Sequence, residues 1–272
     1  MPNSTLARPR CALTIAGSDS GGGAGIQADL KTFAAHRVHG LSAIAALTAQ
    51  HTRGVAAVQV PPVDFLRAQI DACFDDFDIG AVKLGMLANA EVIGAVADAL
   101  TAHKPRFIVL DPVMVATSGA KLLQDDALDA LRTRLLPLAD ILTPNLPEAE
   151  LLLGHAIADA QAALAAPATL REMGARAVLL KGGHLHEGTQ VIDRYEDAET
   201  RAEFIHERLS IDAHGTGCTL ASAIAANLTR GLPMLDAVRA ATDYIHRALR
   251  SGYRPGHGEV LVLDHFGAAT LQ

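Results

Sequence analysis

The chain has 272 residues, and its formal net charge of -7 argues against DNA or RNA as a partner, because nucleic-acid binding needs a basic surface. Half of the residues are hydrophobic, but no run approaches the roughly 18 consecutive apolar residues that span a membrane. The three cysteines, Cys11, Cys73 and Cys218, lie far apart without a Cys-x-x-Cys pair, which argues against a zinc ribbon and favours a reducing cytoplasm.

Residues 1–9 are expected to form a disordered leader, and residues 10–272 a single domain. Arg8 and Arg10 precede an apolar stretch at 11–16, but that stretch is too short for the hydrophobic region of a signal peptide. No linker, repeat or low-complexity segment divides the remainder.

Short apolar runs alternate with longer segments of helical periodicity along the chain. Strands are expected at 12–15, 41–47, 81–84, 107–110, 141–142 and 177–180. Helices are expected at 24–35, 63–74, 91–100, 126–136, 147–153, 216–228 and 234–250. Segments 190–195 and 202–208 predict a β-hairpin that turns at Asp197. This alternation predicts a mostly parallel sheet with helices on both faces, and ligands bind at the carboxyl ends of the strands in such sheets.

A glycine-rich segment at 21–25 follows the first expected strand. No Gly-Lys dipeptide occurs in the chain, which excludes a Walker A loop, and Ile26 stands where a dinucleotide-binding fingerprint has its third glycine. We interpret the segment as a tight turn that lets a ligand approach the backbone. Turn chemistry alone is the alternative.

The run His214-Gly215-Thr216-Gly217-Cys218 opens an Ala-rich helix. Glycines at a helix start allow several N–H groups to converge, and the helix dipole favours an anion there. In the first turn, the pKa of the Cys218 thiol is expected to be lowered, which makes it a candidate base. Ordinary helix capping with Cys218 in the core is the alternative, and His214 is expected to have a structural role beside the anion hole.

Polar residues follow three of the expected buried strands. Asp111 follows the strand at 107–110, Asn145 and Glu148 follow the next strand, and Lys181 follows the strand at 177–180. Carboxylates in such a place suit Mg²⁺, and Lys181 is positioned to reach a phosphate. The alternatives are helix capping by Asn145 and Glu148 and a solvated lysine. Acid, amide, cation and anion hole together indicate a site for phosphoryl transfer.

The chain resembles the hydroxymethylpyrimidine/phosphomethylpyrimidine kinases of thiamine biosynthesis, which belong to the ribokinase-like superfamily. Matching stretches follow in the family's order at 13–19, 25–31, 48–50 and 83–87, and the Asp111, Asn145, Lys181 and Gly-Thr-Gly-Cys motifs complete the series. The resemblance implies an α/β fold, a ribokinase-like three-layer α/β/α arrangement with a mostly parallel central sheet. It also implies ATP-dependent phosphorylation of 4-amino-5-hydroxymethyl-2-methylpyrimidine and then of its monophosphate, with Mg²⁺, by a cytoplasmic homodimer.

The resemblance assigns roles to particular residues of this chain. Gln50 would hydrogen-bond the aminopyrimidine edge, and the residues expected near the ring are Asp29, Met86, Val113 and Gly17. Cys218 would be the base, with backbone N–H groups of Gly215, Thr216 and Gly217 beside it. Asp111 and Glu148 would organise Mg²⁺ and ATP, and Asn145 and Lys181 would lie near the phosphates.

The chain departs from the family pattern at Ser20-Gly21, where Pro-Ser is common, and at His51, where Asn is common. Both departures fall on the substrate side, so a pyridoxal or pyridoxine kinase, or one of dual specificity, is the main alternative. A non-catalytic protein that binds a vitamin precursor is a distant alternative, since it would not need Asp111, Glu148 and the anion hole together. A dehydrogenase is disfavoured by Ile26.

Overall fold

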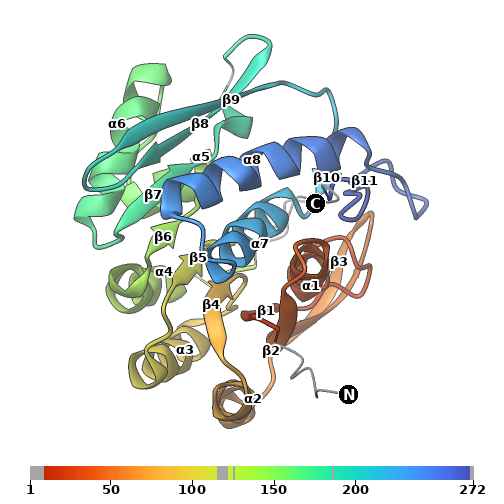
Figure 1. The fold of residues 1–272 in the computed structure, drawn as a ribbon, viewed down its shortest axis with the longest axis vertical. Coiled ribbons are helices and arrows are strands. Elements are labelled where there is room, and N and C mark those ends of the chain that lie inside the picture. The colour runs from red at the N-terminus through yellow and green to blue at the C-terminus, as the bar shows by residue number, and fades with distance from the viewer. Residues whose placement is uncertain (1–8, 115–121, 125, 186, 270–272) are drawn as a thin grey trace, which may run out of the picture.

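The computed structural model describes residues 9–114, 122–124, 126–185 and 187–269. The expected leader lies outside the described residues except for Pro9. Within the described ranges, nine strands form one sheet in the order β3-β2-β1-β4-β5-β6-β7-β8-β9 (Figure 1).

The middle of the sheet is parallel, as predicted. Its six parallel strands are β1 (Cys11–Gly17), β2 (His39–His51), β4 (Ile79–Leu84), β5 (Ile108–Leu110), β6 (Ile141–Leu142) and β7 (Ala177–Leu180). Antiparallel pairing extends each edge, by β3 (Gly54–Gln59) beside β2 and by β8 (Gln190–Glu196) and β9 (Arg201–Glu207) beyond β7. The predicted hairpin is therefore confirmed as β8 and β9.

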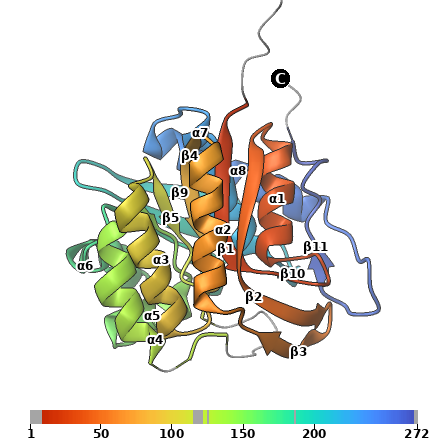
Figure 2. The same ribbon diagram turned by 90° about the horizontal axis from the view of Figure 1, so that it is seen from below.

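Helices cover both faces of the sheet, which confirms the three-layer α/β/α fold (Figures 1 and 2). One face carries α1 (Gly25–Ala35), α7 (Thr216–Thr229) and α8 (Met234–Arg250), and the other carries α2 (Val63–Asp76), α3 (Ala90–His103), α4 (Ala127–Ala130), α5 (Leu146–Leu153) and α6 (Ala160–Glu172). Each face has its own apolar core, because successive residues of a strand point to opposite sides. In β1, for example, Ala12 packs toward α7 and Leu13 toward α2 and α3. No helix in the described part of the chain combines the length and apolar character needed to cross a bilayer.

The structure differs from the predicted elements in four places, and three of these differences have local causes. The helix expected at 126–136 is broken into α4, a π-helical turn at Leu131–Leu135 and a 3₁₀ turn at Leu136–Leu138, and Pro137 cannot donate the N–H that would continue it. Helix α6 was not predicted because Pro167 lies inside it, and β3 was not predicted because its side chains are mostly exposed and do not alternate. The short parallel pair β10 (Ala213–His214) and β11 (Leu261–Val262) was also not predicted.

Candidate active site

A cavity of about 950 Å³ opens where the parallel strands end. It extends from the ends of β1 and β2, past β4 and β5, to the end of β7 and the start of α7. This is the crevice in which open α/β sheets bind their ligands. The residues predicted from the sequence that line it are Gly17, Gln50, Met86, Asp111, Val113, Asn145, Glu148, Lys181, Gly215, Thr216, Gly217 and Cys218.

At one end of the cavity, Lys181 lies between two carboxylates. Its Nζ is 3.0 Å from Asp111 Oδ1 and 3.7 Å from Glu148 Oε2. Burial alone would lower the pKa of Lys181, but the two carboxylates raise it above its usual range, so the group stays charged. The alternative of a solvated lysine is wrong, because only 14% of its side chain is exposed.

The cluster has the composition of a site for a divalent cation. Two carboxyl groups outnumber the one ammonium group, and Asp111 Oδ2 is buried without a hydrogen-bond partner. An unpartnered buried acceptor is costly unless a ligand satisfies it. The described residues provide no set of three or more His, Cys, Asp or Glu side chains for a metal. The carboxylates of Asp111 and Glu148 fit Mg²⁺, because this ion takes few protein ligands and completes its shell with water and phosphate oxygens.

Asn145 and Glu148 form a capping box at the start of α5. Glu148 N donates to Asn145 Oδ1 at 2.9 Å, and Asn145 N donates to Glu148 Oε2 at 2.7 Å. The capping alternative is thus part of the structure, and both residues also line the cavity. Burial raises the pKa of Glu148 to about 7, with Lys181 opposing the shift.

The N-terminus of α7 faces this cluster. Gly215 is its N-cap with φ of 78°, a conformation that favours glycine, and it has no side chain to occupy the first N–H groups of the helix. At Gly217, a Cβ would lie 2.9 Å from Lys181 Nζ and 3.5 Å from Asp111 Oδ2. The glycine therefore keeps open the space where an anion would meet the helix N-terminus, Lys181 and Asp111.

Cys218 is placed as expected, but the expected direction of its pKa shift is wrong. Burial raises the pKa of its thiol to about 11, and the nearby Asp29 and Asp111 add to this effect. Lys83 and a hydrogen bond from the backbone of Gly25 act in the opposite direction but are outweighed. In the ligand-free site the thiol is therefore protonated at neutral pH.

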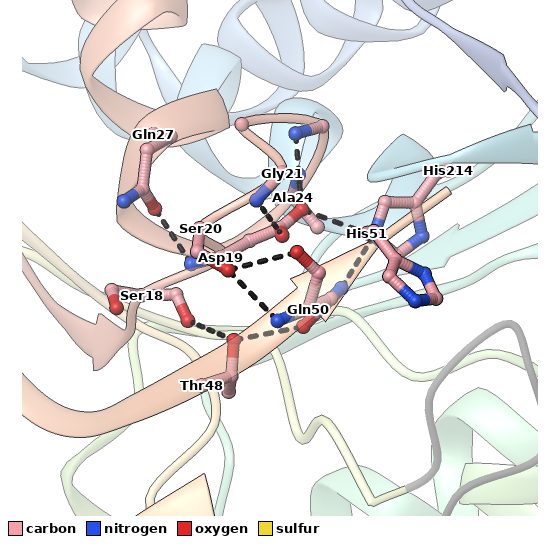
Figure 3. Close-up of polar contacts among 12 residues, drawn as sticks. Ser18, Asp19, Ser20, Gly21, Ala24, Gln27, Thr48, Gln50, His51 and His214 are labelled. Atoms are coloured by element: carbon pink, nitrogen blue, oxygen red, sulfur yellow. Dashed lines mark hydrogen bonds and ion pairs between the residues drawn. The ribbon is translucent and has the colours of Figure 1, made fainter. Parts of the chain in front are cut away.

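The other end of the cavity is less charged. Gln50 lies between Thr48 and His214, as Figure 3 shows, with its amide oxygen 3.1 Å from Thr48 Oγ1 and its amide nitrogen 2.7 Å from His214 Nε2. Gly17 and Met86 are in close contact, since a Cβ on Gly17 would lie 2.7 Å from the Met86 sulfur. Gly17, Gln50 and Met86 all line this end of the cavity.

Asp29 was expected near the ring, but it does not line the cavity and is fully buried behind it. Its carboxylate accepts hydrogen bonds from Thr14 Oγ1 and Ser222 Oγ, each at 2.7 Å, and from Lys83 Nζ at 2.9 and 3.0 Å. The expectation is therefore wrong, because a buried carboxylate must be paired and Asp29 finds its partners inside the protein. Lys83 was missed, although a lysine inside the apolar run 81–84 is a visible signal.

Asp19 is a second site residue without a predicted role. It lines the cavity, and its carboxylate accepts N–H groups of Gly21, Gly23 and Ala24 at 2.8 to 3.0 Å, so it organises the glycine-rich turn (Figure 3). Its Oδ2 is also 3.2 Å from His214 Nε2. Burial opposes the shift, but these hydrogen bonds hold the pKa of Asp19 below its usual range, so it is a carboxylate.

Comparison with known proteins gives consistent results. The family model for phosphomethylpyrimidine kinase matches residues 19–263. The hydroxymethylpyrimidine/phosphomethylpyrimidine kinase of Rhizobium meliloti (strain 1021) is 52% identical over 89% of this chain and 91% of its own. The structure of phosphomethylpyrimidine kinase from Clostridium difficile 630 matches with a TM-score of 0.77 and 40% identity over 86% of this chain and 96% of its own. Pyridoxal kinase from Staphylococcus aureus, in complex with AMP-PCP and pyridoxal, matches with a TM-score of 0.86 and 31% identity over 96% of this chain and 94% of its own.

Proposed function

This chain belongs to the phosphomethylpyrimidine kinase family, and on that premise we propose that its cavity binds ATP and Mg²⁺ at the Lys181 end and an aminopyrimidine at the Gln50 end. It is a kinase of thiamine biosynthesis that phosphorylates 4-amino-5-hydroxymethyl-2-methylpyrimidine and then its monophosphate. The observation that carries the site assignment is Lys181, held between Asp111 and Glu148 beside the glycine-opened N-terminus of α7.

Each group at the Lys181 end has a definite task. Lys181 and the N–H groups of Gly215, Thr216 and Gly217 stabilise negative charge on the transferred phosphoryl group. Asp111 and Glu148 would hold Mg²⁺, which supplies neutralisation of charge between the phosphates of the nucleotide. Asn145 fixes the Glu148 backbone and so holds this carboxylate in place.

Cys218 lies on α7 next to Gly217 and faces the cavity between the two ends. We assign to it the proton of the substrate hydroxymethyl group. The thiol is protonated at neutral pH and cannot take a second proton, so Cys218 acts through its minor thiolate form. The thiolate takes the hydroxyl proton late, as the substrate oxygen bonds to the γ-phosphorus and the bond from that phosphorus to ADP breaks. This order suits phosphoryl transfer, whose loose transition state needs little proton removal at the start.

The experiment is an ATP-consumption assay with the hydroxymethylpyrimidine, its monophosphate, pyridoxal and pyridoxine in separate reactions, with Mg²⁺ and with EDTA. Turnover of both pyrimidines that EDTA abolishes supports the proposal. Turnover of pyridoxal alone would move the substrate to the alternative that the Staphylococcus aureus neighbour favours, and would leave the phosphoryl-transfer site intact.

The role of Cys218 is tested by Cys218→Ala. We expect turnover to fall by about 10²- to 10⁴-fold, the range for loss of a group that handles a proton, while nucleotide binding measured by calorimetry is retained. Activity within severalfold of the wild type would remove Cys218 from this role.

We further propose that the chain is one domain and forms a homodimer in the cytoplasm. One nine-stranded sheet, built from strands between residues 11 and 207, supports the first statement, and the family resemblance supports the others. Sedimentation and one cooperative unfolding transition test the assembly and the domain.

A further inference from the structure

His214 Nε2 faces two groups at once in the ring end of the cavity. It is 2.7 Å from the side-chain amide of Gln50 and 3.2 Å from Asp19 Oδ2 (Figure 3). One ring nitrogen carries either a proton or a lone pair, and the two states demand opposite partners. The partners therefore report which state this nitrogen adopts.

Asp19 Oδ2 can only accept, because the carboxylate is ionised, and it also receives the N–H groups of Gly23 and Ala24. A lone pair on His214 Nε2 would face this negative oxygen and be repelled. A proton on the same nitrogen would be attracted. Asp19 thus favours the form of His214 that is protonated at Nε2.

Thr48, on the other side of the Gln50 amide, is consistent with the same state of His214. The Thr48 hydroxyl has one proton and is 2.7 Å from the carbonyl oxygen of Ser18, which can only accept. Thr48 Oγ1 is then left as an acceptor toward Gln50, 3.1 Å away. An acceptor on this side is satisfied by the amide nitrogen of Gln50.

Both neighbours are satisfied when the amide of Gln50 is turned by 180° about its last side-chain bond. The oxygen then faces His214 Nε2–H and the nitrogen faces Thr48 Oγ1, a change that exchanges two atoms of similar size. In the opposite orientation, nitrogen faces nitrogen at 2.7 Å, and the single proton of Thr48 must serve two oxygens. Counting protons therefore selects one orientation.

We propose that Asp19 and His214 are positioning residues that set substrate specificity by fixing the orientation of the Gln50 amide. The inference deepens the proposed function and rests on it. With the oxygen on the His214 side and the N–H on the Thr48 side, the amide offers an acceptor and a donor in a fixed order. An aminopyrimidine has an amino donor next to a ring-nitrogen acceptor, so it pairs with this edge in only one register. A phenolic hydroxyl, which both donates and accepts, is much less sensitive to the order.

The test compares kcat/KM for the hydroxymethylpyrimidine with that for the same compound lacking its 4-amino group. In His214→Leu, which cannot donate, we expect the preference for the amino compound to fall by about tenfold or more, mainly through KM. In His214→Gln, which keeps a donor near the position of Nε2, the preference should stay within about threefold of wild type. His155→Leu, at an exposed histidine outside the cavity, is the matched control and should retain both efficiencies.

An equal loss for both compounds in His214→Leu would reduce His214 to a structural role and overturn the proposal, as would failure of His214→Gln to recover the preference. A second measurement does not depend on turnover. Long-range ¹H–¹⁵N NMR of the ligand-free protein should show His214 protonated at Nε2, and Asp19→Ala, which removes the acceptor at that nitrogen, should lower the protonated fraction. An unprotonated Nε2 in the wild type would overturn the proposal, whereas absent pyrimidine turnover with a protonated Nε2 would count against the proposed substrate alone.

Discussion

At the scale of single residues, two opposing effects act on the pKa of the Cys218 thiol. The N-terminus of α7 and the buried cation of Lys83 favour the thiolate, whereas burial favours the neutral thiol. Burial prevails and raises the pKa to about 11. Position in a helix is visible in a sequence, but the depth of burial is not, which explains why the sequence pattern predicted the wrong direction.

The reactivity of Cys218 toward iodoacetamide follows from this pKa. Since only the thiolate reacts, the alkylation rate of the ligand-free protein should rise about tenfold per pH unit from pH 7 to 10. Mass spectrometry of the peptide that contains Cys218 separates it from Cys11 and Cys73. A plateau below pH 9 would contradict the prediction and mean that Lys83 and the helix N-terminus outweigh burial.

Asp19 and Asp29 show that membership of a sequence motif does not predict whether a side chain lines the cavity. Both belong to stretches that match the family, yet Asp19 lines the cavity and Asp29 is sealed behind it. Spacing could not separate them, because the difference depends on Lys83 and Ser222, which lie 54 and 193 residues from Asp29 in the chain.

At the scale of elements, the start of α7 packs directly on the glycine-rich turn before α1. A Cβ on Gly215 would clash with the carbonyl oxygen of Gly23, and the positive φ adds strain for any other residue. Two loops that are almost 200 residues apart are thereby held in one geometry. The anion-binding end and the ring-binding end of the cavity depend on this contact.

Gly215→Ala should therefore lower the free energy of unfolding by about 1–3 kcal/mol and reduce turnover. Gly94→Ala is the matched control: nothing lies within 4 Å of the added methyl group, and alanine in the middle of α3 should stabilise by about 0.5–1 kcal/mol. Denaturant unfolding of both variants measures the difference. Equal stabilities would show that the contact with Gly23 relaxes without cost.

The sequence predicted most helices because their apolar residues recur with helical periodicity, and most parallel strands because they are continuous apolar runs. It did not predict β3, whose Ala56, Ala57 and Val58 are all exposed, nor α6, where Pro167 interrupts the pattern. Helix α6 nevertheless has a side-chain N-cap, since Asp159 Oδ1 accepts a hydrogen bond from Ala162 N at 2.8 Å. Elements whose formation depends on pairing or capping rather than on periodicity are the ones that were missed.

At the scale of the molecule, a polar network crosses the otherwise apolar contact between sheet and helices. Lys83 on β4 and Asp29 on α1 are fully buried and paired, and hydroxyl groups from Thr14 on β1 and Ser222 on α7 complete the network. Burial alone would lower the pKa of Lys83, but Asp29 raises it above its usual range, so Lys83 stays charged. Four elements are thus fixed relative to one another at one point.

Removal of one partner should be far more costly than removal of both. Lys83→Met leaves Asp29 buried without its cation and should lower the free energy of unfolding by about 3–5 kcal/mol. The double variant Lys83→Met/Asp29→Asn removes both charges. It keeps an acceptor for one of the Thr14 and Ser222 hydroxyls and offers the other an N–H, so it should recover about half of that loss or more. If the double variant is as unstable as the single one, the pair contributes through packing rather than charge.

The order of strands in the sheet has a consequence for how such an enzyme changes over time. In the proposed site, the groups assigned to the ring come from β1, β2, the turn after β1 and Met86 after β4. The groups assigned to the phosphates follow β5, β6 and β7, and the start of α7 lines the cavity beside both. The two ends are joined at one point, because Gly23 in segment 17–51 contacts Gly215 at the start of α7. Changes in this segment that alter recognition must therefore leave that contact in place. We expect recognition to change first through side chains on β2 and after β4, which can vary without moving the backbone that carries the groups for phosphoryl transfer.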